Sequence, residues 1–438
     1  MKITFLGAGS TIFARSVLGD CMCCEALKDC EIALYDIDPL RLKESERILA
    51  AINMGKGAHA KITVYAGVEN LEKALENSFC IVNAIQVGGY DPCTITDFEI
   101  PKKYGLRQTI ADTIGIGGIM RALRTIPVME TFSRVIGKAC PNAWLLNYSN
   151  PMAMLSGYMQ RYTSVKTIGL CHSVQVCSQR LLESLGMEDK LQGRRELIAG
   201  INHMAWLLDI RDKSGADLYP EIRRRAKEKN AREKHDDMVR FDYIDKLGYY
   251  CTESSEHNAE YSPFYIKGKF PELIEKFNIP LDEYPRRCVS QIEGWKKEYE
   301  KLAEIDTLEH SRSVEYASHI IEALASGKPY AFGGNLLNRG LIENLPPDAC
   351  VEVPCLSDGG GIRGCHAGRL PVHLAAMNMT NINVHLVTIE AARTKKREHI
   401  YHAAMLDPHT ASELTPDQIR AMVDNLIEAH GNWLPRYS

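Results

Sequence analysis

The sequence predicts an α/β protein with two parts, an N-terminal parallel sheet flanked by helices and a C-terminal α+β part. Three observations predict this. Short apolar runs alternate with helical spacings up to about Arg195, a rhythm typical of parallel βαβ units. The first apolar run ends in a glycine-rich turn, Gly7-Ala8-Gly9. After about Arg195 this alternation stops. We therefore expect domains at 1–195 and 196–438.

The elements of the first part follow one another in order. Apolar runs of strand length are expected at 2–6, 31–35, 61–65, 79–85, 143–147 and 165–170. Helical spacing follows the first run to about Asp20 and recurs at 40–54 and 71–75. The last two runs are each followed by a polar loop, and they continue the sheet.

The second part has fewer clear signatures. Residues 221–234 are charge-rich and helical, which is typical of a solvated helix. Residues 263–285 carry several prolines and aromatics and are expected to form irregular cover over a site. Helices are expected over at least part of 311–326 and 370–398.

Composition excludes several classes of partner. Hydrophobic residues make up 45% and charged residues 25%, the balance of an ordinary globular protein. The formal net charge of −4, with both signs interspersed, gives no case for nucleic acid or an anionic membrane as partner. No stretch approaches the roughly 20 apolar residues of a membrane span. The first apolar run is too short for a signal peptide, and the 14 cysteines fit no disulfide framework, so we expect a cytoplasmic protein with reduced thiols.

The first turn carries the signature of a dinucleotide site. Gly7 and Gly9 let the backbone approach a pyrophosphate at a positive helix N-terminus. Asp36 ends the second strand, where its carboxylate is placed to accept a hydrogen bond from a ribose 2′-OH. The pattern departs from the fingerprint at Ile12, which stands where a third glycine is usual, and Asp36 lies further on than the usual ~20 residues. An ordinary βα turn is the alternative to a Rossmann-like NAD-binding domain.

A second signal is a thiol and an imidazole at two strand ends. Cys171-His172 follows the run 165–170, and Asn202-His203 follows the apolar run 197–201. Cys171 and His203 could hold one divalent cation, with substrate oxygens completing an open, catalytic shell. The alternative is a buried inert cysteine and a histidine that satisfies core polar groups.

Three loops also carry polar side chains. Asp112 lies in the glycine-rich stretch 110–118, which either lets backbone approach a ligand or is a flexible connection. Asn150-Pro151 follows a strand and could present an amide to cofactor or sugar. The loop 252–261 is crowded with titratable groups, and its alternative is a solvated polar loop.

These motifs together resemble glycoside hydrolase family 4. The resemblance rests on Phe5-Leu6-Gly7-Ala8-Gly9-Ser10-Thr11, Asp36-Ile37-Asp38, Asn150-Pro151-Met152, Cys171-His172-Ser173-Val174, Gly200-Ile201-Asn202-His203, Val351-Glu352-Val353-Pro354-Cys355 and Ala404-Met405-Leu406-Asp407-Pro408. It covers essentially the whole chain. Cys171-His172-Ser173-Val174 is similar to the α-galactosidase (melibiase) branch, whereas phospho-glycosidases usually carry an acidic or amide residue at position 172.

The resemblance implies a role for individual residues. Cys171 and His203 would bind a divalent cation, usually manganese. NAD would be held by Gly7, Gly9, Ser10, Thr11, Asp36 and Gln86. Asn150 would contact the sugar beside the nicotinamide, and Arg287 would contact it on the far side. His172 stands at the position of the proposed acid, and Asp112 at an acidic position near the base. The base would fall in the loop 252–261, where we favour His257 over Glu256 and Tyr261.

The implied chemistry is elimination and addition rather than the two-carboxylate mechanism. The sugar would be oxidised at C3 by NAD, lose its C2 proton, expel the group at C1, add water and be reduced again. We expect an α-galactoside substrate, a malate/lactate dehydrogenase-like fold, and a homo-oligomer, dimer or tetramer. An α-glucosidase, an α-galacturonidase, a malate/lactate-type NAD dehydrogenase and a non-catalytic NAD sensor are the alternatives.

Overall fold

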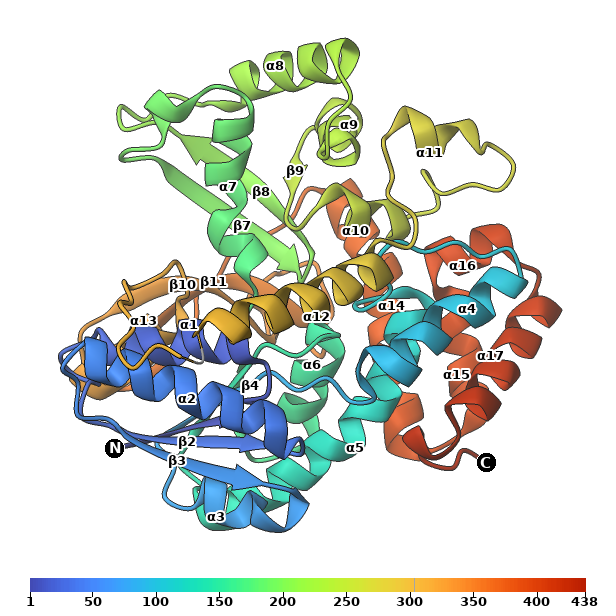
Figure 1. Cartoon of the computed structure of the whole chain (residues 1–438). Coiled ribbons are helices and arrows are strands. Elements are labelled where there is room, and N and C mark those ends of the chain that lie inside the picture. The colour runs from blue at the N-terminus through green and yellow to red at the C-terminus, as the bar shows by residue number, and fades with distance from the viewer. Residues whose placement is uncertain (303) are drawn as a thin grey trace.

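The computed structural model describes residues 1–302 and 304–438 and has the expected α/β architecture (Figure 1). The strands are β1 (Lys2–Leu6), β2 (Glu31–Asp36), β3 (Lys61–Ala66), β4 (Cys80–Asn83), β5 (Trp144–Asn147), β6 (Lys166–Gly169), β7 (Arg195–Ile201), β8 (Met204–Arg211), β9 (Tyr250–Cys251), β10 (Tyr330–Leu337), β11 (Cys350–Asp358) and β12 (Gly361–Gly364). The helices are α1 (Thr11–Met22), α2 (Pro39–Gly55), α3 (Leu71–Leu75), α4 (Ile95–Lys103), α5 (Gly115–Ala139), α6 (Met152–Tyr162), α7 (His172–Ser184), α8 (Tyr219–Arg232), α9 (Met238–Leu247), α10 (Ser255–Glu260), α11 (Glu272–Lys276), α12 (Glu283–Leu302), α13 (Ala317–Ser326), α14 (Val372–Thr394), α15 (Arg397–Leu406), α16 (Pro408–Glu413) and α17 (Pro416–His430).

The first six strands form a parallel sheet in the order β3-β2-β1-β4-β5-β6. This is the strand order of a doubly wound dinucleotide-binding fold, and the order reverses between β1 and β4. All five residues of β1 are buried, as a central parallel strand requires. In such sheets the ligand crevice lies at the carboxyl ends of the strands on either side of the reversal. The turn after Leu6 and the loop after Asn83 occupy that place.

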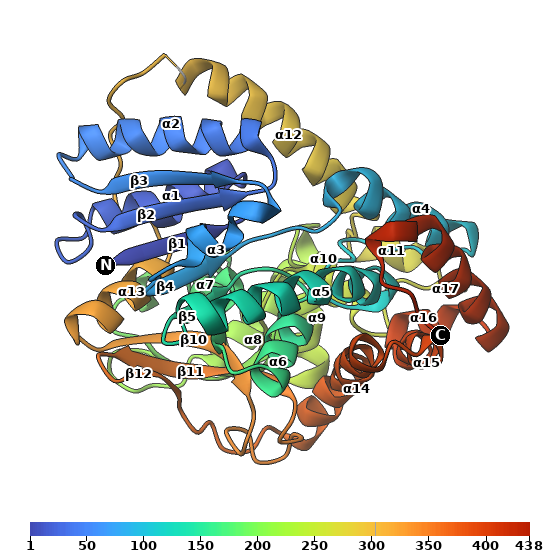
Figure 2. The same ribbon diagram turned by 90° about the horizontal axis from the view of Figure 1, so that it is seen from below.

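The strands of the second part extend the same sheet. β10 runs antiparallel to β6, with Asn335 opposite Gly169, and the order continues β10-β11-β7-β8-β9. Figure 2 shows β10, β11 and β12 on the opposite side of β1 and β4 from β2 and β3. β10 and β11 were not among the strands expected from the sequence. The predicted boundary near residue 195 is therefore crossed by one continuous sheet, and the division into two domains stays a prediction.

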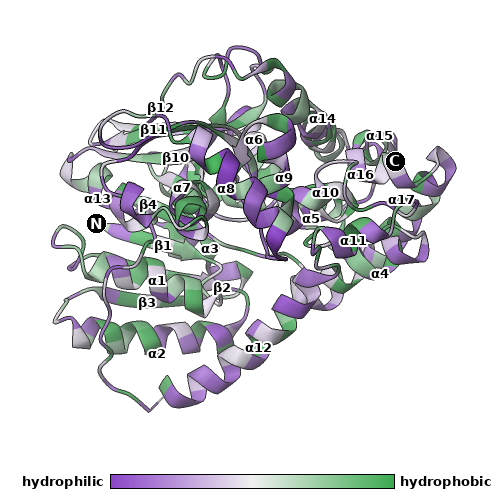
Figure 3. Cartoon of the chain, turned by 90° about the horizontal axis from the view of Figure 1, so that it is seen from above, coloured by the Kyte–Doolittle hydropathy of each residue, from purple (hydrophilic) through white to green (hydrophobic). Residues whose placement is uncertain are grey.

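Three segments of the second part can be compared with what their sequences predict. α8 has only Tyr219, Ile222 and Ala226 buried, and it is mostly hydrophilic in Figure 3, as expected of a solvated helix. Residues 263–285 are largely irregular, apart from α11 and the start of α12. Of the stretch 311–326 only α13 is helical. Ser313, before this helix, is hydrogen-bonded through its side chain to Asp20 of α1 (2.7 Å).

The long helix α12 joins the two parts of the molecule. Figures 1 and 2 show it running from the edge near α2 toward α4. Its Glu298 binds Arg15 of α1 at 2.8 Å, and the indole N–H of Trp295 donates to Glu44 of α2 at 2.7 Å. Among the described residues, no helix has the length and apolar character needed to cross a membrane.

Candidate active site

The glycine turn after β1 packs so closely against neighbouring residues that it has no room for side chains. Gly7 has φ +86°, and its N–H donates to the carbonyl of Tyr35 (2.9 Å). A Cβ at Gly7 would lie 2.8 Å from the carbonyl oxygen of Ala84, and one at Gly9 would lie 2.7 Å from the Asp36 carboxylate. Only glycine fits at both positions. Ser10 then occupies the N-cap position of α1 and Thr11 begins the helix, so the positive end of α1 faces the turn.

Asp36 lies beside this turn, as predicted. Its Oδ2 accepts from the backbone N–H of Gly9 (2.6 Å) and its Oδ1 from that of Asp38 (3.0 Å). A carboxylate has about four acceptor sites, so it can still accept from a ribose hydroxyl. Gln86 follows β4 and is exposed, with its amide 3.4 Å from Thr94 Oγ1. The turn, Asp36 and Gln86 follow the neighbouring strands β1, β2 and β4, so they share one edge of the sheet.

Cys171 and His203, which are 32 positions apart, are brought together. Cys171 is the residue before α7, and Asn202-His203 is the turn between β7 and β8. A third group joins them: Glu253 Oε2 lies 3.4 Å from His203 Nε2 and 4.0 Å from Cys171 Sγ. One ligand atom from each of the three residues lies within 4.8 Å of the other two.

Hydrogen bonds to Nδ1 fix the orientation of the His203 imidazole. Its Nδ1 lies 3.0 Å from Thr113 Oγ1 and 3.1 Å from the hydroxyl of Tyr261. Both partners use Nδ1 and leave Nε2 facing Glu253. Support of the second ring nitrogen is the usual arrangement of a metal-binding histidine.

The donor set fits a divalent cation. A thiolate, an imidazole and a carboxylate are ligands of divalent first-row metals. Burial raises the pKa of the Cys171 thiol, and the Glu253 and Glu352 carboxylates raise it further. The side-chain amide of Asn202, next to His203, is buried and without a hydrogen-bond partner in the described part of the chain. A cation would balance the negative charge of Glu253 and of Cys171 once its thiol is deprotonated.

Asp112 and Asn150 adjoin the same group. Asp112, from the loop between α4 and α5, accepts from the amide of Asn150 (3.1 Å) and from the hydroxyl of Thr113 (2.7 Å). His257 Nε2 lies 3.8 Å from Asp112 Oδ1. Burial acts to raise the pKa of Asp112, but the Arg121 guanidinium and the nearby imidazoles outweigh it and hold the pKa below its usual value. Asp112 therefore stays ionised at neutral pH.

The loop after β9 supplies the remaining titratable groups. His257 Nδ1 lies 2.7 Å from Ser254 Oγ and 3.7 Å from Glu253 Oε1. Burial lowers the pKa of His257, which favours the neutral imidazole. Burial acts to raise the pKa of Glu253, but His203, His257 and Arg240 outweigh it and lower the pKa to about 2.

The three residues considered as base are now distinguished by their contacts. Glu256 forms an ion pair with Arg287, and Tyr261 lies against His203. Only His257 of the three faces Asp112 through a contact in the described structure. Arg287, predicted to contact the sugar, is on α12 and binds Glu256 and Glu283, and no contact joins it to the Cys171–His203 pair in the described part of the chain.

His172 occupies the first position of α7. Its Nε2 is hydrogen-bonded to Glu315, and its ring packs within 6.4 Å, centroid to centroid, of Phe13, Tyr148 and Tyr316. The imidazole is 46% exposed, so it can exchange protons with solvent or substrate.

Sequence reasoning missed Glu253, Thr113 and Glu315. Glu253 was part of the polar loop but had no assigned role. Its signal in the sequence is weak, because β9 has only two residues, Tyr250 and Cys251. Thr113 and Glu315 have no local signal, since their partners are 90 and 143 positions away in the chain.

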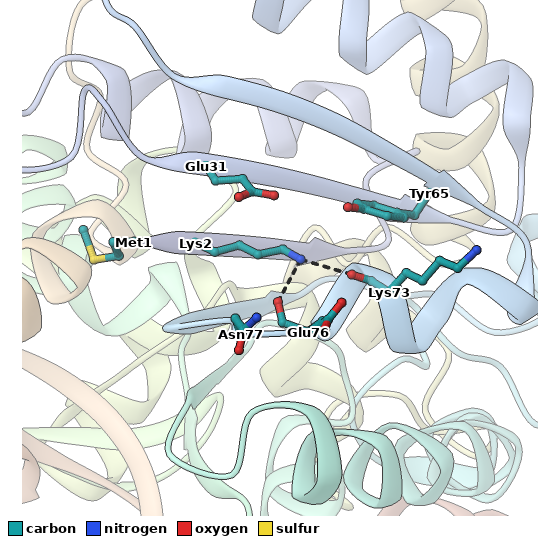
Figure 4. Close-up of a pocket in the computed structure, with 7 residues that line it drawn as sticks. All are labelled: Met1, Lys2, Glu31, Tyr65, Lys73, Glu76 and Asn77. Atoms are coloured by element: carbon teal, nitrogen blue, oxygen red, sulfur yellow. Dashed lines mark hydrogen bonds between the residues drawn. The ribbon is translucent and has the colours of Figure 1, made fainter.

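A shallow pocket elsewhere on the sheet is not part of this site. Figure 4 shows its lining of Met1, Lys2, Glu31, Tyr65, Lys73, Glu76 and Asn77. Lys2 donates to the backbone carbonyls of Lys73 (3.1 Å) and Glu76 (2.9 Å) and so caps α3. Lys2 and Glu31 begin β1 and β2, whereas Gly7 and Asp36 mark the other ends of these strands.

Known proteins similar to this chain share its full length. It is 59% identical to an α-galactosidase of Bacillus subtilis over 436 residues, covering 100% of this chain and 99% of that protein. It is 33% identical to an α-galactosidase of Rhizobium meliloti, covering 100% and 90% of the two chains. Among solved structures, a 6-phospho-α-glucosidase from gut microorganisms in complex with NAD and Mn²⁺ has a similar fold, with a TM-score of 0.82, 21% identity and coverage of 100% and 99%.

Two family descriptions match successive parts of the chain. "Family 4 glycosyl hydrolase" matches residues 2–187, and "Family 4 glycosyl hydrolase C-terminal domain" matches residues 198–410. The resemblance seen in the motifs is thereby confirmed, and the dehydrogenase and sensor alternatives are set aside: the chain belongs to family 4 of the glycosyl hydrolases.

Proposed function

We infer that this chain is an NAD- and Mn²⁺-dependent α-galactosidase. The observation that carries this is the 59% identity to an α-galactosidase along the whole chain. The site supports it, because a dinucleotide-type turn and a thiol–imidazole–carboxylate group occur in one fold. A hydrolase working with two carboxylates needs neither feature.

Each cofactor has a set of residues. Gly7, Gly9, Ser10, Thr11, Asp36 and Gln86 would hold NAD, and Cys171 and His203 would hold the cation. When bound, NAD takes up and returns a hydride at C3 of the sugar while the cation polarises the C2 and C3 oxygens. Asn150, anchored on Asp112, would position the sugar.

The protein's own groups move the protons. His257 is the base for the C2 proton, because burial keeps its imidazole neutral and Ser254 holds the ring at Nδ1, while Nε2 faces Asp112 at 3.8 Å without a hydrogen bond. His172 assists departure of the group at C1 as the acid, and Glu315 holds its ring. Asp112 stabilises the imidazolium that forms when His257 takes a proton.

Isotope exchange tests this chemistry. An α-galactoside hydrolysed in D₂O should yield galactose with deuterium at C2, seen by NMR or mass spectrometry, because the base exchanges its proton with solvent. A two-carboxylate hydrolase leaves the C2–H bond intact. Release of unlabelled galactose by protein stripped of NAD would overturn the oxidative mechanism.

Substrate range is tested by a panel of nitrophenyl α-glycosides with NAD, Mn²⁺ and a thiol reductant. We expect the galactoside to be hydrolysed with the highest kcat/KM, because both relatives named above are α-galactosidases. A higher value for the glucoside or the galacturonide would favour the corresponding alternative.

The protein is further proposed to be cytoplasmic and homo-oligomeric, as a dimer or tetramer. All 14 cysteines are free, which suits a reducing compartment. Val289 and Ile292 lie three residues apart on α12 and are 40% and 58% exposed, an apolar surface that a second copy could cover. Analytical ultracentrifugation checks the oligomeric state, and a monomer across micromolar concentrations contradicts it.

A further inference from the structure

We propose that Glu253 is a third protein ligand of the divalent cation, beside Cys171 and His203. This inference rests on the proposed assignment of those two residues. It changes the site from one with two protein ligands to one with three, and from one anionic ligand to two.

Strand pairing places Glu253 beside His203. β8 and β9 are antiparallel neighbours, with Trp206 opposite Cys251, and the N–H of Thr252 donates to the carbonyl of Ala205 (2.8 Å). His203 directly precedes β8 and Glu253 lies two residues after β9, so both residues lie at the same end of this antiparallel strand pair. The backbone of Glu253 has φ +65° and that of His203 φ +62°, values that residues other than glycine rarely adopt. Strained backbone of this kind concentrates at functional sites.

The distances fit ligands of one ion. Zinc-type bonds of about 2.0–2.3 Å in tetrahedral geometry place neighbouring ligand atoms roughly 3.3–3.8 Å apart. Glu253 Oε2 lies 3.4 Å from His203 Nε2 and 4.0 Å from Cys171 Sγ. The first separation lies within this range and the second is slightly longer, so a small shift of the Glu253 side chain would place the three donors around a common centre.

The charges of the group call for a cation. The Cys171 thiol must become a thiolate to bind metal, and a thiolate beside the Glu253 carboxylate in a largely buried site is stable only with positive charge between them. Glu253 faces two imidazoles, His203 at 3.4 Å and His257 at 3.7 Å, and the one guanidinium that acts on it, that of Arg240, is already ion-paired with Asp237. Glu256, three residues later in the same loop, instead pairs with the permanent charge of Arg287. The two glutamates therefore have different partners, and of the two only Glu253 contacts the thiol of Cys171 and the imidazole of His203.

A third ligand has a functional consequence. Cys171 and Glu253 together neutralise a divalent ion, so the protein alone should retain the cation before sugar arrives. A six-coordinate ion such as Mn²⁺ would still have positions open for two sugar oxygens.

Titration of free Mn²⁺, followed by electron paramagnetic resonance without sugar, tests the ligand. Glu253→Gln should weaken Mn²⁺ binding by at least the ~10–100-fold that loss of an outer-shell partner costs. Glu256→Gln is the matched control and should keep the affinity of the unsubstituted protein. NAD affinity and circular dichroism establish that each variant is folded.

Cobalt absorption separates a ligand from a nearby positioning residue. In Co²⁺-loaded Glu253→Gln, loss of a carboxylate ligand should shift the visible d–d bands relative to the unsubstituted protein, whereas Glu256→Gln should leave them unchanged. Either unshifted bands or undiminished Mn²⁺ affinity in Glu253→Gln overturns the proposal. Cys171→Ser distinguishes the two levels of inference. If Mn²⁺ affinity is unchanged in both Cys171→Ser and Glu253→Gln, the proposed Cys171–His203 site is wrong. If Mn²⁺ affinity falls in Cys171→Ser but not in Glu253→Gln, only the role of Glu253 is rejected.

Discussion

The imidazole Nε2 of His172 is hydrogen-bonded to the carboxylate of Glu315, a buried residue 143 positions later in the chain. The other contacts of the ring are with the aromatic side chains of Phe13, Tyr148 and Tyr316. Glu315 therefore restrains the ring of His172 while almost half of it stays exposed, and we propose that it positions His172 for its role as acid.

Glu315→Gln should impair departure of poor leaving groups more than of good ones. A general acid contributes roughly 10²–10⁴-fold to a rate, and a misoriented acid loses part of that. We expect kcat for an alkyl galactoside to fall by about 10-fold or more, with KM little changed. Nitrophenyl galactoside, whose leaving group departs without a proton, should be much less affected. An equal loss on both substrates would contradict the role of His172 as acid.

Removal of the cation should abolish turnover, and Mn²⁺ with a thiol reductant should restore it. Burial and the nearby carboxylates raise the pKa of Cys171, so the thiol must lose a proton when it binds metal. Where one proton is released per cation, Mn²⁺ affinity should rise about tenfold per pH unit. Titrations between pH 6.5 and 8.5 check this. A flat profile, or metal-free activity of Cys171→Ser, would reject Cys171 as ligand.

Asp36→Ala should weaken NAD binding by on the order of 1–3 kcal/mol, the cost of losing a charged hydrogen-bond partner. Asp38→Ala is the matched control. Asp38 caps α2 through the N–H groups of Leu40 and Arg41, so its loss should cost about 1 kcal/mol of stability and leave NAD affinity intact. Fluorescence titration with NAD measures both. Equal affinities in the two variants would place the ribose contact elsewhere.

Glu352→Gln should make metal-free protein more stable at alkaline pH. Glu352 is fully buried, with Oε1 accepting from Asn335 (2.9 Å), and burial raises its pKa to about 7. Between about pH 4.5 and 7 the folded state binds more protons at this carboxyl than the unfolded chain, so the free energy of unfolding falls as pH rises. Above pH 7 the variant should gain up to about 3 kcal/mol over the unsubstituted protein.

Urea unfolding at pH 5, 6, 7 and 8 measures the Glu352 effect. Glu428→Gln, on the exposed face of α17, is the control and should follow the unsubstituted protein at every pH. If the curves of Glu352→Gln and the unsubstituted protein remain parallel from pH 5 to 8, the carboxyl of Glu352 does not carry this titration.

The sequence by itself determined the N-terminal half of the sheet. The runs at 2–6 and 61–65 were confirmed as strands to within one residue. The first is apolar because the central strand β1 is buried throughout, whereas β3 is an edge strand without a buried residue, and its sequence signal is its β-branched and aromatic residues. The glycine turn is likewise local, since the positive φ of Gly7 and the close approach of Gly9 to Asp36 depend on residues within one βαβ unit. Motifs spaced along the chain identified the family without any structure.

Only the tertiary structure decided what surrounds the proposed catalytic groups. That β10 and β11 extend the first sheet follows from the pairing of Asn335 with Gly169, which no local pattern records. Glu253 reaches Cys171 across 82 positions and Glu315 reaches His172 across 143. A carboxylate has the same local sequence signature whether it faces solvent, an arginine or a thiol. Its role is set by which distant side chains the folded backbone brings within about 4 Å.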